Sequence, residues 1–472
     1  MAFSIFPRFQ ALQWTLGRSA YRAFAAAVGV PMSDPIPDTP SSEPFAKPPS
    51  EGVKISKLDN GFTVTSLETH SPVAKVALLV KAGSRYEAAE SLGVTHHLRA
   101  TAFMATKDRT AFRVSREIDH LGGNLSASST RDHFIYSAEC LREYVEPVVD
   151  TLANVSLDPI FQPWEVADQT RLVQLELAMA AQSPHVGIVE DLHKAAFRST
   201  LGNSLYCLPH VVGRINPDQL RSHVSSHFHP DRMVLAGIGV NHDELLKLAL
   251  ASFGRTSTSF HGSDVASKYY GGEIRTETNS DLVHAALVSE GASFVGDDYF
   301  AVGVLQRVLG VTPFIKWGSN TASSRVNKAA SDAAGGSPAM ASGFNAAHSD
   351  SGLFGLYVVC YAENAGKVIK AAVGEFASAA MGNISEEEVT RAKNQFKANI
   401  LMDNEDSSSL LFDIGTQVIL RKSYTNAQAA ADAVDKVTKD QVIKVAKRIF
   451  NGKPTFVARG KLHQTPYLDE LR

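Results

Sequence analysis

The sequence predicts an α+β protein made of two homologous halves, each of which contains strands and helices. Beyond residue 52, short runs of branched apolar residues alternate with longer segments of helical periodicity. Two pairs of distant segments also resemble each other at nearly the same spacing, which indicates an internal duplication. A chain of 472 residues is too long for one ordinary core and suggests about two to four domains.

The first 33 residues differ in composition from the rest of the chain. They contain Arg8, Arg18 and Arg22 and no acidic residue, because the first acidic residue is Asp34. On a helix, the apolar residues that would share one face opposite Arg18 and Arg22 are Phe9, Leu12, Leu16, Ala20 and Ala23. A basic, acid-free amphipathic leader is typical of a mitochondrial transit peptide, although an ordinary amphipathic helix would show the same pattern.

The domain boundaries follow from changes in composition. We predict a transit peptide at 1–33, a Pro-rich linker at 34–51, an N-terminal domain at 52–253, a Gly/Ser hinge at 254–272 and a C-terminal domain at 273–472. The linker prolines prevent helix formation and remove backbone donors.

Strand signals come first within the N-terminal domain. Residues 62–67 (FTVTSL) and 75–80 (KVALLV) are rich in branched apolar side chains and are bounded by the turn signals Asn60-Gly61 and Gly83-Ser84. Residues 124–140 (NLSASSTRDHFIYSAEC) suggest a hairpin that follows later in the same domain.

Helical periodicity predicts helices at 94–105, 113–121 and 141–156. Gly122-Gly123 should cap the second of these at its C-terminus. A longer helix should start near Pro163, since proline is tolerated in a first turn, and should end before Pro184.

The duplication rests on two matches. Residues 215–240 align without a gap with 437–462 at an offset of 222 residues, and each segment reads as a capped helix followed by a buried strand. The helix from Glu165-Val166 has a counterpart at Glu388-Val389, at an offset of 223. Either match could arise by chance, but together they favour duplication.

Composition excludes several classes of function. A net charge of −3 gives no case for nucleic-acid binding. The three cysteines, Cys140, Cys207 and Cys360, form no CxxC pair, which argues against a zinc ribbon or a secreted disulfide framework. No apolar run approaches the roughly 18 residues needed to cross a bilayer. Any membrane location is therefore expected to come through partners.

Residues 93–106 (GVTHHLRATAFMAT) look like a metal-binding helix whose metal chemistry has been replaced. A known zinc-peptidase pattern is H-x-x-E-H on a helix, with two His ligands four residues apart and a Glu as general base. Here His96 is followed by Arg99 and Ala100 at the Glu and second His positions. No nucleotide-binding motif (GxxxxGK[ST] or GxGxxG) and no GxSxG motif supplies another chemistry.

The pattern and its surroundings resemble the mitochondrial processing peptidase and pitrilysin family of metallopeptidases. The resemblance extends to ALLVKAGSRYE before the motif, to HLGGNLSASSTRDH after it and to SGFNAAHSDSGLFGLY in the second half, and covers nearly everything from residue 52. It implies two halves of the inverzincin type, each a mainly antiparallel sheet flanked by helices. It also implies a third metal ligand, a Glu some 76 residues beyond the second His position, which is Glu176.

The resemblance therefore leaves His96 and Glu176 as remnant ligand positions and Arg99 and Ala100 as inactivating replacements. Alanine cannot coordinate a metal, and arginine stays protonated and cannot act as a base. At about 5 Å and an effective dielectric of about 20, a guanidinium facing a divalent ion costs roughly 6 to 7 kcal/mol. We expect no catalytic residue, no bound metal and no other cofactor.

Neighbouring residues leave alternatives open. His97 points about 100° around the helix from His96, so we expect a surface or boundary histidine there. Glu176 either pairs with Arg99 or faces solvent, and its flanking residues Leu172, Leu175 and Met179 suggest that it is partly buried.

A second histidine group lies at His223, His227 and His229. The first two are four residues apart on a predicted helix, which is a spacing that metal ligands use. No carboxylate or cysteine accompanies them, so we expect a solvated helix end there rather than a metal site.

Within this family, VKAGSRYE, THHLR, WEVAD, NSLYC, GSNTASS and TPYLDEL resemble the core subunits of mitochondrial ubiquinol:cytochrome c reductase, respiratory complex III. This resemblance implies a noncatalytic subunit that supports assembly and stability of the complex. Such a subunit is peripheral to the inner membrane on the matrix side, pairs with core protein 1 and other complex III subunits, and belongs to the complex III dimer.

Two alternatives remain. One is a noncatalytic presequence-binding partner subunit of the processing peptidase, which would carry a glycine-rich loop where this chain has only Gly310 and Gly318. The other is an active zinc peptidase, against which Arg99 and Ala100 argue.

Overall fold

The computed structural model describes residues 51–254, 256, 264–311 and 324–471. The predicted transit peptide, nearly all of the linker and part of the predicted hinge lie outside the described residues, as do Gly318 and most of the GSNTASS segment. Of the helices in the described ranges, none combines the length and apolar character needed to cross a bilayer.

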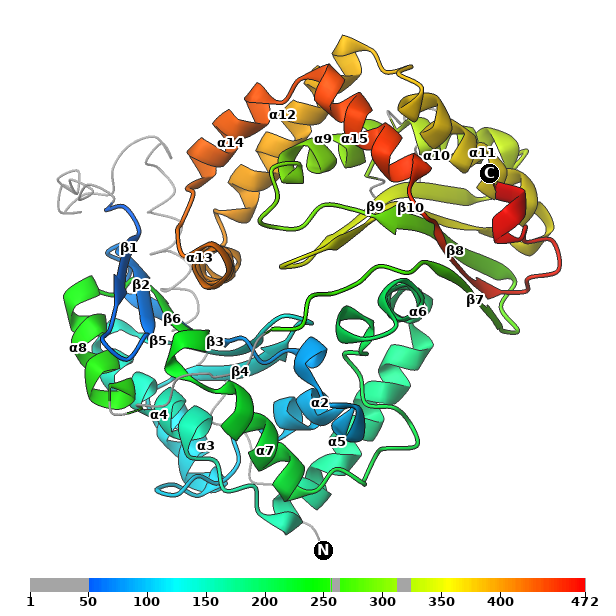
Figure 1. The fold of residues 1–472 in the computed structure, drawn as a ribbon. Helices are drawn as coiled ribbons and strands as arrows, with labels where there is room; N and C mark the ends of the chain where they lie inside the picture. The colour runs from blue at the N-terminus through cyan, green and yellow to red at the C-terminus, as the bar shows by residue number, and fades with distance from the viewer. Residues whose placement is uncertain (1–50, 255, 257–263, 312–323, 472) are drawn as a thin grey trace, which may run out of the picture. The chain divides into compact units, whose positions relative to one another are not determined.

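The first sheet has six strands in the order β1-β2-β6-β3-β5-β4 (Figure 1). Only the β2–β6 pair is parallel. The strands are β1 (Lys54–Lys57), β2 (Thr63–Leu67), β3 (Val73–Val80), β4 (Asn124–Ser129), β5 (Phe134–Leu141) and β6 (Met233–Ile238). The predicted strands at 62–67 and 75–80 and the hairpin at 124–140 are confirmed.

The second sheet has five strands in the order β7-β11-β8-β10-β9, with a single parallel pair, β7–β11. The strands are β7 (Gly272–Glu277), β8 (Leu282–Glu290), β9 (Ala339–Ala347), β10 (Gly352–Tyr361) and β11 (Thr455–Gly460). Its order repeats that of the first sheet without β1. The predicted α+β fold with mainly antiparallel sheets is thus confirmed.

The helices of the first half are α2 (Val94–Ala100), α3 (Ala111–His120), α4 (Val145–Leu157), α5 (Pro163–Gln182), α6 (Pro184–Phe197), α7 (Pro217–His227) and α8 (His242–Phe253). Gly122 has a φ of +64°, and Gly122 and Gly123 donate to the carbonyls of Asp119 and Ile118, which closes α3 as predicted. The helix predicted at 94–105 is shorter than expected. It ends at Ala100, where the Thr101 hydroxyl donates back to the His97 carbonyl.

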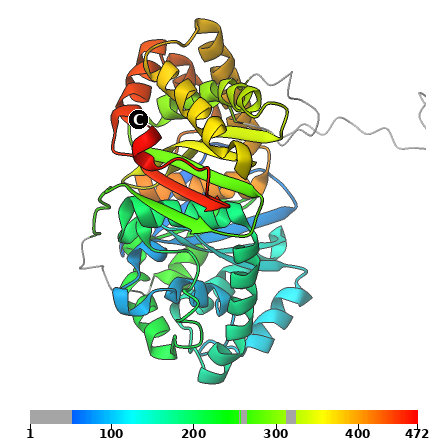
Figure 2. The same ribbon diagram turned by 90° about the vertical axis from the view of Figure 1, so that its right-hand side faces the viewer.

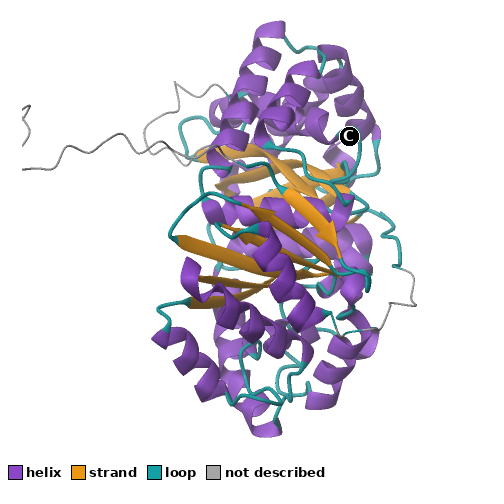
Figure 3. Cartoon of the chain, turned by 90° about the vertical axis from the view of Figure 1, so that its left-hand side faces the viewer, coloured by secondary structure: helices purple, strands orange, loops and turns teal. Residues whose placement is uncertain are grey.

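The helices of the second half are α9 (Tyr299–Leu309), α10 (Arg325–Ala333), α11 (Ala365–Ala380), α12 (Glu386–Asp403), α13 (Ser407–Arg421), α14 (Ala427–Lys436) and α15 (Lys439–Asn451). In Figure 3 the strands of both sheets lie between an upper and a lower group of helices.

The duplication is visible in local detail. Both α7 and α15 begin with a capping box, formed by Asn216 with Gln219 and by Thr438 with Gln441. The strands that follow, β6 and β11, occupy equivalent places beside the central strand of their sheets. The same residue types at the same spacing therefore build the same unit twice.

Each sheet is covered in part by a helix from the other half. Ile188 and Leu192 of α6 pack with Val288 and Val457 of the second sheet. In turn, α13 packs against β3 and β6 of the first sheet, and Figures 1 and 2 show it beside that sheet. The α13 contact involves Leu411, Ile414 and Val418 with Leu79, Val234 and Ala236. Neither sheet is covered by residues of its own half alone.

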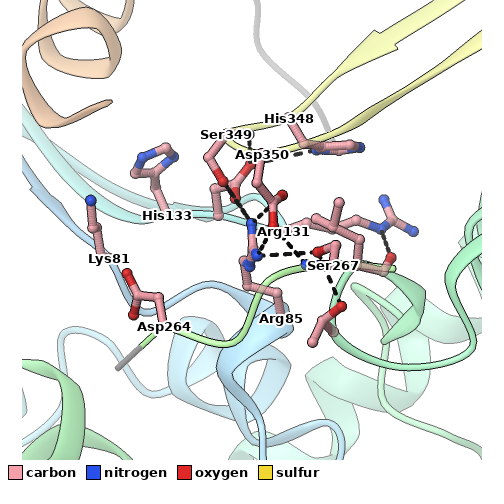
Figure 4. Close-up of polar contacts among 12 residues, drawn as sticks. Lys81, Arg85, Arg131, His133, Asp264, Ser267, His348, Ser349 and Asp350 are labelled. Carbon is pink, nitrogen blue, oxygen red and sulfur yellow. Dashed lines mark hydrogen bonds and ion pairs between the residues drawn. The ribbon is translucent and has the colours of Figure 1, made fainter. Parts of the chain in front are cut away.

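A buried polar cluster also joins the halves (Figure 4). The Arg85 side chain is only 4% exposed and donates to Asp132 at 2.8 Å and to both carboxylate oxygens of Asp350 at 3.0 and 2.8 Å. Burial alone would raise the pKa of Asp132. Interactions with His348, His133 and Ser349 outweigh burial and hold that pKa well below its usual range. An ionised carboxylate thus lies between the halves, balanced by a guanidinium.

The first prediction concerns Gly415 on α13. A Cβ atom there would lie 2.5 Å from a methyl group of Leu79, which is fully buried. We expect Gly415→Val to lower the free energy of unfolding by about 1 to 3 kcal/mol through overpacking. Urea unfolding would measure the change.

Gly374→Val is the matched control, because Gly374 is an exposed glycine of α11 with open space around its Cβ position. That variant should be neutral or slightly stabilising, since valine costs less than glycine in a helix. Equal effects of the two substitutions would contradict close packing of α13 on the first sheet.

Candidate functional site

The start of α2 is fixed by glycine and by a buried carboxylate. Gly93 has a φ of +90°, and a Cβ atom there would lie 2.8 Å from the Cys207 sulfur. The Glu87 carboxylate accepts from the backbone N–H groups of Gly93 and Thr95, each at 2.8 Å. Burial raises the pKa of Glu87 to about 7. The helix that carries His96 is therefore held rigidly at its N-terminus.

His96 is fully buried, and its hydrogen bonds define its tautomer. Its Nδ1 accepts from the Cys207 backbone N–H at 3.0 Å, so the ring proton lies on Nε2. Nε2 then donates to Oε2 of Glu176 at 2.5 Å. Burial lowers the pKa of His96, which favours the neutral ring.

Arg99 donates from Nη2 to the same Glu176 oxygen at 2.6 Å. The structure thus brings together the expected residues, and the pairing of Arg99 with Glu176 is confirmed. Burial alone would raise the pKa of Glu176, but the bonds from His96 and Arg99 outweigh it and lower that pKa. The carboxylate is therefore ionised and engaged by two donors.

Ala100 lies at the end of α2 and contributes only a methyl group. In the part of the chain that the structure describes, no group of three or more His, Cys, Asp or Glu side chains is placed to hold a metal ion. What this arrangement does chemically is to tie α2 to α5 through a charge-assisted hydrogen-bond network.

The prediction for His97 is wrong. The residue is 1% exposed, and Nδ1 bonds to the Gly93 carbonyl at 3.1 Å. The physical reason is that α2 packs against α5, β4 and α7, which together cover the side of the helix that carries His97. Its periodicity could not indicate which side chain is exposed.

The prediction of a solvated helix end at His223 is also wrong. His223 is 6% exposed and its Nε2 lies 3.3 Å from the Ala82 carbonyl, because α7 packs against α2. Its ring centroid lies 4.8 Å from that of His227. Burial lowers the pKa of His223 to about 4 and that of His227 to about 3. Both rings are therefore held neutral, His223 in a buried position and His227 in a partly exposed one.

The residues expected to bury Glu176 do not do so. Leu172, Leu175 and Met179 are 40%, 57% and 63% exposed. The half-buried state of Glu176 comes from His96 and Arg99 on α2 instead.

Sequence reasoning missed Glu87, Cys207 and the Arg85 cluster as parts of the site's framework. Their signals were present, since Arg85, Asp132 and Asp350 all lie inside the segments that carry the family resemblance. Which of these charged residues contact one another cannot be predicted from one sequence, because they are far apart in the chain.

Comparisons with known proteins define the class to which this fold and site belong. Residues 63–208 match the family described as insulinase (peptidase family M16), and residues 214–396 match the peptidase M16 inactive domain. The chain belongs to the peptidase M16 family.

Within that family the chain is similar to the mitochondrial cytochrome b-c1 complex subunit 2, or core protein 2. It is 40% identical to the Homo sapiens subunit over 426 residues, which are 90% of this chain and 93% of that protein. It is 39% identical to the Rattus norvegicus subunit over 89% of this chain and 92% of that protein. The resemblance inferred from the quoted motifs is confirmed.

A more distant relative is the mitochondrial-processing peptidase subunit alpha of Solanum tuberosum. The identity is 29% over 450 residues, which are 94% of this chain and 87% of that protein. The b-c1 relatives and the inactive-domain match together support a chain without peptidase activity of its own.

The second prediction concerns the pH dependence of stability. His223 stays neutral in the fold down to about pH 4 but takes a proton near pH 6.5 when unfolded. The unfolded state therefore binds more protons between these values, and stability falls as pH falls through this window. We expect His223→Gln to remove up to about 3 kcal/mol of this pH dependence.

Urea unfolding at pH values from 4.5 to 7, a range set by the window of about 4 to 6.5, would measure the slope. The control is His120→Gln, the same substitution at the exposed end of α3. An unchanged slope in His223→Gln would show that His223 does not stay neutral in the folded protein.

Proposed function

We propose that this chain is a noncatalytic structural core subunit of mitochondrial respiratory complex III, where it supports assembly and stability of the complex. The observation that carries this proposal is the 40% identity that extends over 93% of the human b-c1 subunit 2. Since the similarity covers almost the whole relative, it concerns the surfaces as well as the core.

The chemistry of the α2–α5 site supports a noncatalytic role. In our proposal, His96 and Glu176 are remnants of a zinc ligand set, Arg99 replaces the catalytic Glu and Ala100 replaces the second His ligand. The Glu176 oxygen that would face a metal instead accepts from His96 and Arg99 at 2.5 and 2.6 Å. A metal cation bound there would lie close to the positively charged guanidinium of Arg99. The repulsion between the two charges costs several kcal/mol at a separation of about 5 Å.

Location and partners follow from the same proposal. We place the chain at the mitochondrial inner membrane, on the matrix side and attached through partners. These are core protein 1 and other complex III subunits within the complex III dimer. The acid-free leader with Arg8, Arg18 and Arg22 supports mitochondrial import. No cofactor and no nucleic acid are required for this role.

A second candidate is a noncatalytic presequence-binding partner of the processing peptidase. The 29% identity with the Solanum tuberosum processing-peptidase subunit favours it. The lower identity makes it the weaker candidate.

The third prediction separates the two candidates. In blue-native electrophoresis of mitochondria, we expect the chain to migrate with complex III, and depletion of the chain to lower the amount of assembled complex. Migration with processing activity, and not with complex III, would overturn the structural role.

The fourth prediction tests the origin of the site. We expect the double variant Arg99→Glu with Ala100→His to bind about one zinc per chain, because it restores the missing base and ligand beside His96 and Glu176. Equilibrium dialysis with metal analysis would measure it against the wild-type chain.

The matched control adds Glu176→Gln to that double variant, which should abolish the gain by removing the third ligand. A folded double variant with no gain in zinc would show that these four positions are not the remains of a zinc site.

A further inference from the structure

The second half contains a counterpart of the α2–α5 site, and it is open. Val80 pairs with Met233 in the first sheet, and Val288 pairs with Thr455 at the equivalent place in the second. Arg99 and Arg307 follow Val80 and Val288 at the same spacing. The helices α9 and α12 thus repeat α2 and α5.

Asn399 lies on α12 where Glu176 lies on α5, at the same distance from the helix N-cap. With its amide oxygen turned toward Arg307, Asn399 accepts from the guanidinium at 3.2 Å. The carboxylate that closes the first site is therefore a neutral amide here. Arg307 lines a cavity of about 550 Å³ that is bounded by α9, α12, α13, α14 and β9.

Two guanidinium groups line this α9–α12–α13 cavity, Arg307 and Arg421. Within the described residues, neither has a carboxylate within the 4.0 Å of an ion pair. Arg307 donates to the carbonyl of Gly303 at 3.0 Å and lies 4.0 Å from the Phe396 ring centroid. Arg421 donates to the carbonyl of Phe294. Among the described residues, the groups that accept hydrogen bonds from these two guanidiniums are neutral.

Two carboxylates line the same cavity, Asp403 and Asp413. Neither has a Lys, Arg or His partner at ion-pair distance among the residues described. Asp413 accepts only from the side chain of Gln417, at 2.8 Å, and burial raises its pKa. The cavity thus holds positive and negative groups that do not neutralise one another by contact.

The walls and the size restrict the ligand further. The rings of Phe294, Tyr299, Phe300 and Phe396 line the cavity, and its volume lies in the range of small-molecule sites, about 300 to 1,000 Å³. Asp403 is exposed, whereas Asp413 is half-buried. A simple anion would leave Asp413 without a charged partner, and a simple cation would leave both guanidiniums without one. A ligand with one charge of each sign and an apolar side chain satisfies both sets of groups.

We propose that the α9–α12–α13 cavity binds a free zwitterionic α-amino acid with an apolar or aromatic side chain. Its carboxylate faces Arg307 and Arg421, and its ammonium faces Asp403 and Asp413. The side chain packs on the aromatic walls. This binding is independent of the structural role in a complex, since it concerns a separate cavity in the second half.

The first test uses the unaltered full chain. Isothermal titration with L-phenylalanine and L-leucine should give saturable binding. N-acetyl-L-phenylalanine and L-phenylalanine amide each lack one charge, so they should bind about 10- to 100-fold more weakly. No saturable binding up to about 10 mM, near the weakest affinity that such a titration resolves, would overturn the proposal. Equal binding of the blocked compounds would do the same.

The second test locates the site. Arg421→Gln and Asp413→Asn should each weaken L-phenylalanine binding about 10- to 100-fold by removing one charged partner. The control is Arg116→Gln, an exposed arginine of α3 in the first half, which should bind as the wild type does. Wild-type affinity in both cavity variants would contradict the assignment, and if a variant fails to fold, the blocked compounds still decide.

Discussion

The exchange of α6 and α13 between the two sheets is the contact on which the rest of the structure depends. Each helix covers apolar strand residues of the other half, so that part of each sheet is buried by a helix that its own half does not supply. The exchange also brings the polar residues of the two halves together. Arg85 and Asp132, both buried, then meet Asp350 of the other half, whose side chain is 29% exposed. A buried ion pair is favourable only where its geometry is good, and the apolar contacts of α6 and α13 hold the two halves in that geometry.

The α2–α5 site is constrained by the same packing. Since α2 is enclosed by α5, α7 and β4, a charged or polar residue on it must find a partner in place. Glu176 supplies that partner for both His96 and Arg99. Glu176 thereby joins the helices α2 and α5 through a single carboxylate oxygen.

The sequence predicted well those features that are local or that follow a fixed spacing. The caps of α3, α7 and α15 and the meeting of Arg99 with Glu176 are of this kind. It failed where burial depends on distant elements. His97 and His223 were assigned to the surface because nothing near them in sequence shows that α2 and α7 pack together. The packing of α6 and α13 on the sheet of the other half could not be predicted either, since an apolar helix face does not indicate which of the two sheets it covers.

The two halves show how one position can be used in two ways. Arg99 and Arg307 occupy equivalent places, and each donates to a residue at the equivalent place on the following long helix. In the first half that residue is Glu176, whose carboxylate forms an ion pair with Arg99 and so cancels its charge. In the second half it is the amide of Asn399, so the charge of Arg307 is not cancelled at that place. Arg307 is half-buried, and a partly desolvated guanidinium without a counter-ion lowers stability unless other groups supply compensation. The neighbouring cavity, with Asp403 and Asp413 on its wall, is where a charged ligand can supply that compensation.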